Sequence, residues 1–126
     1  ALIRKFIEAK AQKKNEVIVW GTGMATREFL YVEDCAEGII LATENYDKPD
    51  PINIGSSFEI SIRELVALIQ KIVEFEGEVS WDTTKPDGQP RRKLDVSKAE
   101  NEFGFVSKTN FEKGLRETIT WYQKHQ

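Results

Sequence analysis

The chain has 126 residues, of which 40% are hydrophobic and 10% aromatic. This is enough for one hydrophobic core, so we expect a single domain over residues 1–126. The formal net charge of -3, without a long stripe of cations, argues against nucleic acid as a partner. No stretch approaches the roughly 20 apolar residues of a membrane span. The only cysteine, Cys35, cannot form an internal disulfide and is typical of a reducing cytoplasm, and with a single histidine we expect no metal site.

The first half of the chain predicts helices and short strands in alternation. Leu2, Ile3, Phe6 and Ile7 recur at helical spacing, which favours an amphipathic helix. Two glycines around Thr22 end the strand that follows, and Asp34 is a candidate N-cap for the second helix. The expected elements are a helix at 2–12, strands at 17–20 and 27–32, a helix at 34–45 and a strand at 52–55.

The second half contains the clearest helix. Ser61-x-x-Glu64 is a capping box, and the apolar residues after it recur at helical spacing as one core-facing stripe. A strand is expected from Glu78 to Trp81. The same box pattern recurs at Ser97 and at Thr109, where it predicts a short helix and a final helix. The sequence therefore predicts a mixed α/β (α+β) module.

A candidate ligand site surrounds the first glycine turn. Trp20 stands directly before Gly21-Thr22-Gly23, and Arg27 follows the turn. An indole face near a guanidinium suits a ligand with a flat ring and an anionic diphosphate, because arginine can hold two phosphate oxygens at once. The alternative is a β-hairpin in which Trp20 packs on the core and Arg27 pairs with Glu28.

A second candidate segment is the loop from Lys85 to Lys93. It holds two prolines, one glycine and four cations around a single carboxylate, Asp87. The prolines restrict the backbone, so the loop loses less entropy when it closes on an anion. Asp87 can accept hydrogen bonds from ligand hydroxyls or from a base. The alternative is a Pro-Asp-Gly turn whose charges are only solvated.

Together, in this order, these segments resemble one family: the GDP-L-fucose synthases, or GDP-4-keto-6-deoxymannose epimerase/reductases, of the extended short-chain dehydrogenase/reductase superfamily. The Lys-Pro-Asp-Gly-x-Pro-Arg loop is the selective feature, whereas the glycine turn with Arg-x-Phe-x-Tyr-Val-x-Asp marks the superfamily. The matching segments include Val19-Trp20-Gly21-Thr22-Gly23, Arg27-Glu28-Phe29, Ile52-Asn53-Ile54-Gly55, Phe75-Glu76-Gly77 and Lys85-Pro86-Asp87-Gly88-Gln89-Pro90-Arg91.

The resemblance implies particular ligand contacts. The residues that match the family's substrate-binding positions are Lys5, Trp20, Arg27 and Asp87. Lys5 departs from the family if arginine is the norm there, because an ammonium cannot form a bidentate fork. Arg91 and Arg92 follow Asp87 closely and are expected as additional phosphate contacts.

Two parts of the family's machinery are not found in these residues. The chain has no glycine-rich cofactor fingerprint, since Met24, Ala25 and Thr26 follow the glycine pair. It has no Tyr-x-x-x-Lys either, so we expect no catalytic residue here, and we interpret Cys35 as a structural thiol. The resemblance then implies a C-terminal substrate-binding portion without its Rossmann domain. NADP(H) is expected only in the complete enzyme, which is expected to be a homodimer, and this chain alone is expected to be inactive.

The expected function is the sugar-nucleotide binding portion of an NADP-dependent epimerase/reductase that acts on GDP-4-keto-6-deoxymannose. Two alternatives remain open at this stage. One is the substrate domain of another NAD-dependent epimerase or dehydratase, acting on a UDP-, CDP- or dTDP-sugar. The other is a noncatalytic nucleotide-sugar binding module. The preferred base would separate the first alternative from the expected function.

Overall fold

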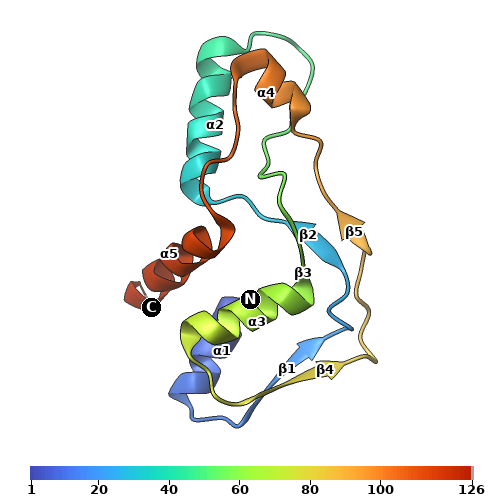
Figure 1. Cartoon of the computed structure of the whole chain (residues 1–126), viewed down its shortest axis with the longest axis vertical. Coiled ribbons are helices and arrows are strands. Elements are labelled where there is room, and N and C mark those ends of the chain that lie inside the picture. Colours follow the sequence, from blue (N-terminus) through green and yellow to red (C-terminus); the bar gives the residue numbers. More distant parts are fainter. Residues whose placement is uncertain (126) are drawn as a thin grey trace.

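A computed structural model describes residues 1–125 as a mixture of helices and short strands, in agreement with the predicted α/β class (Figure 1). In chain order the elements are α1 (Leu2–Ala11), β1 (Glu16–Trp20), β2 (Thr26–Glu28), α2 (Val32–Asn45), β3 (Glu59–Ser61), α3 (Ile62–Val73), β4 (Glu78–Asp82), β5 (Arg91–Arg92), α4 (Ser97–Phe103) and α5 (Phe111–Lys124). Within residues 1–125, no helix combines the length and the apolar character needed to cross a membrane.

The hydrophobic core lies between three helices and a two-stranded sheet. β1 and β4 pair in parallel, and the alternating burial of β1 turns Val17 and Val19 toward the core. Phe6 of α1, Ile69 of α3 and Ile119 of α5 are fully buried there. Burial of each such side chain contributes about 1.5–3 kcal/mol relative to an exposed one. The core therefore fixes the strand ends from which the candidate loops emerge.

A second sheet connects this core to the far end of the molecule. β2 is its central strand and pairs antiparallel with β3 and parallel with β5. Beyond it, α2 and α4 lie beside each other at the end opposite to α1 and α3 (Figure 1). Gly38 permits close packing there, since a Cβ at this position would lie 2.8 Å from Ile54.

Several local predictions hold in the structure. Ser61 caps α3 as predicted: its hydroxyl accepts from the N–H of Glu64, whose side chain accepts from the N–H of Ser61. α1, β4 and the end of α2 also lie within one residue of their predicted positions. α3 carries its own start signal, and α1 has an apolar periodicity.

Other local predictions are wrong. Segment 52–55 is not a strand, because no neighbouring strand pairs with it within residues 1–125. α2 begins at Val32, which shortens the predicted strand 27–32 and places Asp34 in the first turn instead of at the cap. Thr109 does not cap α5, because Asn110 does so through a hydrogen bond from the N–H of Lys113. Ser97 lies inside α4 and donates to Asp95.

Candidate functional site

The two candidate loops, far apart in sequence, contact each other through Asp87. Its Oδ1 accepts the N–H of Thr22 at 2.7 Å, and its Oδ2 accepts the hydroxyl of Thr22 at 2.6 Å. These hydrogen bonds, the side-chain bond first, hold the pKa of Asp87 below its usual value. The carboxylate is therefore charged at neutral pH and keeps the 85–93 loop against the glycine turn.

The glycine turn is shaped for this contact. Gly21 has φ +85°, and a Cβ there would lie 2.2 Å from Oδ1 of Asp87. Gly23 has φ +78°, and a Cβ there would lie 2.5 Å from the Trp81 ring. Both positions thus combine a left-handed backbone with a close approach, which only glycine tolerates without rearrangement.

Arg27 fixes the other end of the same loop. The half-buried side chain lies on β2, and its Nη1 donates to the carbonyls of Thr26 and Gln89, both at 2.7 Å. Its Nη2 lies near Gly88 of the loop, 3.7 Å from the position of a Cβ on that glycine. Within residues 1–125, Nε and Nη2 make no hydrogen bond. These two donors lie on one side of the guanidinium and are parallel, which is the geometry that binds two oxygens of one phosphate.

Trp20 lies on the exposed face of β1, and Lys5 of α1 contacts the same strand. The Trp20 side chain is 66% exposed, and Nζ of Lys85 lies 5.6 Å from the centre of its ring. Nζ of Lys5 donates to the carbonyl of Ile18 at 2.7 Å, two residues before Trp20. The hairpin alternative is wrong: β1 and β2 lie in different sheets, Trp20 is outside the core, and Glu28 accepts from the N–H of Ser56 instead of pairing with Arg27.

The two following arginines have different surroundings. Arg91 forms a bidentate ion pair with Glu59, with Nε to Oε1 at 2.8 Å and Nη2 to Oε2 at 2.9 Å. Hydrogen bonds from Arg91 and then Thr26 lower the pKa of Glu59 to about 2. The side chain of Arg92 is exposed and makes no hydrogen bond or ion pair in the part of the chain that the structure describes. The fork of Arg91 is thus occupied, whereas that of Arg92 faces solvent.

Sequence reasoning did not single out Arg63, nor Thr22 as a residue with its own role. Nη2 of Arg63 donates to the carbonyl of Thr22 at 2.7 Å, and its guanidinium lies 4.7 Å from the centre of the Trp81 ring. From the sequence, Arg63, which follows the Ser61 cap, is expected to be an ordinary exposed helix residue. Only Thr22 carried a usable indication, because a hydrogen-bonding side chain stands between two glycines.

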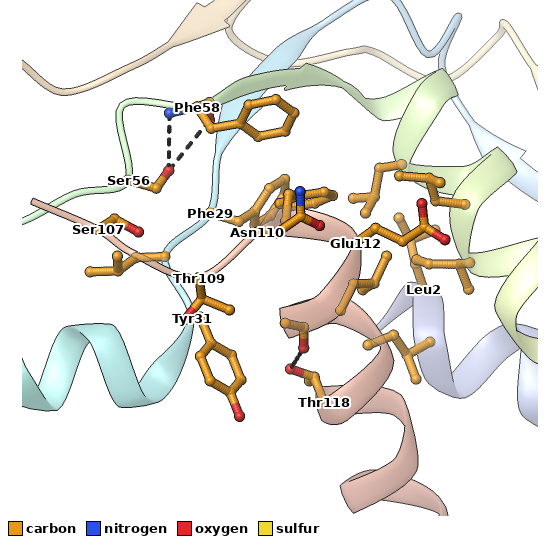
Figure 2. A pocket seen from close by; sticks show the side chains of 18 of the residues that line it. Leu2, Phe29, Tyr31, Ser56, Phe58, Ser107, Thr109, Asn110, Glu112 and Thr118 are labelled. Carbon is orange, nitrogen blue, oxygen red and sulfur yellow. Dashed lines mark hydrogen bonds between the residues drawn. The ribbon is translucent and has the colours of Figure 1, made fainter.

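A separate apolar groove of about 800 Å³ lies on another part of the molecule, between α3, α5 and the segments that contain Phe29 and Phe58 (Figure 2). The ring centres of Phe58 and Phe111 are 5.1 Å apart in this groove. Tyr31 lines it and donates to Glu117 at 2.6 Å, a hydrogen bond that raises the pKa of Tyr31 to about 12. None of the sequence-predicted site residues lines the groove, so it is distinct from the loop site.

The chain is similar to known proteins over nearly its whole length. A model of the NAD dependent epimerase/dehydratase family matches residues 1–55. GDP-L-fucose synthase 1 of Arabidopsis thaliana is 45% identical, over 99% of this chain and 38% of that protein. GDP-L-fucose synthase of Escherichia coli is 40% identical, over 100% of this chain and 42% of that protein.

The fold agrees with these sequence matches. A crystal structure of a GDP-L-fucose synthetase from Naegleria fowleri bound to NADP superposes with a TM-score of 0.92 at 28% identity, over 98% of this chain and 39% of that one. The chain therefore spans about two fifths of the length of these relatives. The chain is thus similar to the C-terminal part of GDP-L-fucose synthases, and its first 55 residues match the NAD dependent epimerase/dehydratase family.

Proposed function

We propose that this chain is the sugar-nucleotide binding portion of an NADP-dependent GDP-L-fucose synthase-like epimerase/reductase. The complete protein would epimerise GDP-4-keto-6-deoxymannose at the two carbons beside the ketone and reduce the ketone with NADPH. It would contain an N-terminal Rossmann portion, form a homodimer and reside in the cytoplasm. The relatives named above support the family branch, and the single cysteine is compatible with a reducing compartment.

The observation that carries this proposal is the state of the Arg27 guanidinium. Its Nη1 is held by two backbone carbonyls, so the planar group has little rotational freedom left. Its Nε and Nη2 remain available as a fork. A diphosphate that binds this fork meets donors that are already oriented, and preorganisation of this kind reduces the entropy lost on binding.

Two neighbours supply the remaining chemistry of a nucleotide sugar. The exposed ring of Trp20 offers a flat apolar face, on which a base can stack in place of the Lys85 ammonium. A carboxylate can accept about four hydrogen bonds, and Asp87 uses two of them with Thr22. Its remaining capacity suits ribose hydroxyls or the N–H groups of a base. Lys5 adds a cation near the Trp20 end of β1.

The glycine turn does not fit a dinucleotide cofactor. The glycine pair is followed by β2 and not by a helix, so the turn lacks the helix N-terminus that binds a pyrophosphate. The Asp87 carboxylate also lies directly on Gly21, where it would repel a second anion. We assign no NADP(H) contact and no catalytic step to these residues. Their proposed contribution is remote binding energy, which positions the sugar against the reacting groups of the complete enzyme.

A calorimetric titration of the chain with GDP, UDP and dTDP tests the proposal. We expect selective binding of GDP. Arg27→Ala is expected to weaken this binding by about 1.5–3 kcal/mol, because a charge-assisted contact is lost. Arg27→Lys keeps the charge without the fork and should recover only part of the loss. Arg116→Ala, which removes an exposed arginine on α5, is the matched control and should bind like the parent chain.

Each other result has a definite meaning. Unchanged GDP affinity in a folded Arg27→Ala variant would contradict the role of the fork. A preference for UDP or dTDP would favour another nucleotide-sugar epimerase or dehydratase. Absence of binding to all three would overturn the assignment of nucleotide recognition to this chain by itself.

A further inference from the structure

The Asp87 carboxylate is held mainly by Thr22, and the backbone N–H of Gly23 adds a further hydrogen bond. Both of its oxygens accept from Thr22, one from the backbone N–H and one from the hydroxyl. The hydroxyl oxygen also accepts from the N–H of Met24 at 3.2 Å, so its own proton is directed at Asp87. Residue 87 is otherwise exposed. Thr22 therefore supplies two of the hydrogen bonds that fix this carboxylate, and one of them comes from its side chain.

Thr22 is itself held by the best-defined helix of the fold. Arg63 in the first turn of α3 donates from Nη2 to the carbonyl of Thr22 at 2.7 Å. The N–H of Arg63 donates to the carbonyl of Gly23 at 2.9 Å. The Ser61 capping box fixes this end of α3. Thr22 is therefore anchored to a rigid helix end and does not lie in a free turn.

The contact at Asp87 differs from the other attachments of its loop. Arg27 and the N–H of Thr26 hold the carbonyls of Gln89 and Pro90, so they fix the loop backbone after its apex. Neither contacts the Asp87 side chain. Loss of the Thr22 hydroxyl would therefore loosen the carboxylate, which would keep its backbone hydrogen bonds, without detaching the rest of the loop.

We propose that Thr22 is a positioning residue, which holds Asp87 so that the unused lone pairs of its carboxylate face the hydroxyl or N–H groups of a bound nucleotide. The proposal rests on the proposed function and adds to it a residue that acts through Asp87. Gly21 and Gly23 then have a shared purpose: they bend the backbone so that the N–H and the hydroxyl of Thr22 reach one carboxylate together.

Two substitutions isolate the hydroxyl. Thr22→Val keeps the branched shape and removes the donor, whereas Thr22→Ser keeps the donor. In GDP titrations we expect Thr22→Val to weaken affinity about 3- to 10-fold and Thr22→Ser to restore most of it, as for loss of one hydrogen bond to a charged group. Both variants should keep the thermal midpoint of the parent chain within a few degrees.

A double-mutant cycle shows whether Thr22 acts through Asp87. If it does, Thr22→Val should cost almost nothing further in an Asp87→Ala background, because the side chain that it orients is already gone. Additive losses would indicate that Thr22 contacts the nucleotide directly, and that result would overturn the proposal. Equal affinities of the parent chain and Thr22→Val would overturn it as well.

A measurement without ligand separates this proposal from the proposed function. In NMR spectra of the free chain, Thr22→Val should shift the Asp87 carboxyl titration to higher pH and raise the mobility of Gly88, while Thr22→Ser should change neither strongly. No change in the valine variant would refute the positioning role, whether or not GDP binds. These two shifts together with no GDP binding would refute the nucleotide-binding function and leave the orientation of Asp87 by Thr22 established.

Discussion

The contact between the glycine turn and the 85–93 loop requires a glycine at position 21. Its φ of +85° lies in the left-handed region, and a Cβ there would lie 2.2 Å from Oδ1 of Asp87 and 3.4 Å from its Cα. A methyl group would therefore displace the Asp87 carboxylate and break its hydrogen bonds with Thr22. Gly104 has a similar φ of +70°, yet no atom lies within 4 Å of its Cβ position.

The comparison of Gly21→Ala with Gly104→Ala separates backbone strain from the loop contact. We expect Gly104→Ala to destabilise the chain by about 1 kcal/mol, the cost of a left-handed conformation for alanine. Gly21→Ala should cost about 1–2 kcal/mol more, because the hydrogen bonds to Asp87 are also lost. Urea denaturation of both variants measures the difference. Equal losses would show that the contact between the loops contributes nothing to stability.

Arg91 and Arg92 show how far a run of charges can be interpreted from sequence. Neighbouring arginines after a cationic loop look alike in a sequence, and both were predicted as phosphate contacts. In the structure one guanidinium is engaged by Glu59 and the other is exposed. The partner of Arg91 lies 32 residues away, so pairing across strands, which no local pattern records, decides which arginine has free donors.

At the scale of elements, α3 was predictable and segment 52–55 was not. α3 has its own start, the capping box at Ser61, and its own buried stripe, in which Leu65, Val66, Ile69 and Val73 lie in the core. A helix closes its hydrogen bonds within itself, so local sequence suffices. A strand needs a neighbour, and its alternating pattern shows only that it could pair. Segment 52–55 has this pattern without a partner in residues 1–125.

Asp34 was expected to cap a helix, but it makes long-range hydrogen bonds instead. The residue lies in the first turn of α2, only 5% exposed. It accepts the hydroxyl of Ser107 at 2.8 Å, and the hydroxyl and N–H of Thr109 at 2.8 and 3.0 Å. Burial raises the pKa of Asp34, but these hydrogen bonds together outweigh burial and leave the pKa below its usual value.

We expect Asp34→Asn to destabilise the chain by about 1–3 kcal/mol, because an amide has a single oxygen and its NH2 group would face at least one of the donors that the carboxylate now accepts. Glu33→Gln is the matched control: this exposed carboxylate lies in the same turn and feels the same helix dipole. Denaturant titrations at pH 7 measure both. Losses of equal size would mean that only the dipole is affected, and that the link from α2 to the segment before α5 is unimportant.

At the scale of the molecule, the sequence indicated the two loops of the candidate site but not how they are joined. Trp20, Arg27 and Asp87 were chosen from their residue types and from a family resemblance. In the structure, Arg27 donates to the 85–93 loop, and the same loop carries Asp87. The joining contacts, from Asp87 to Thr22 and from Arg27 to Gln89, span 65 and 62 residues. They depend on the packing of β1 against β4 and of β2 against β5, which is a property of the whole fold.

Three carboxylates hold distant segments together, which gives the whole molecule a defined response to acid. Asp34 joins α2 to the segment before α5, Glu59 joins β3 to β5 across β2, and Asp87 joins the two loops of the site. The pKa of each is lowered in the folded chain, to about 2 for Glu59. A lowered pKa means that the folded state binds protons less readily than the unfolded state, so protonation favours unfolding.

We therefore expect stability to be nearly constant from pH 7 down to about pH 5 and to fall below that, as the unfolded carboxyl groups take up protons near their usual pKa values of 3.8 and 4.5. The contribution of Glu59 should decline over the widest interval, from about pH 5 to about pH 2. Glu59→Gln should thus be less stable at pH 7 and should lose less stability on acidification. Urea titrations between pH 7 and pH 2.5 measure this. Glu76→Gln, at an exposed carboxylate without a hydrogen bond in residues 1–125, should follow the parent curve. If Glu59→Gln followed the parent curve too, its ion pair with Arg91 would not join the strands in solution.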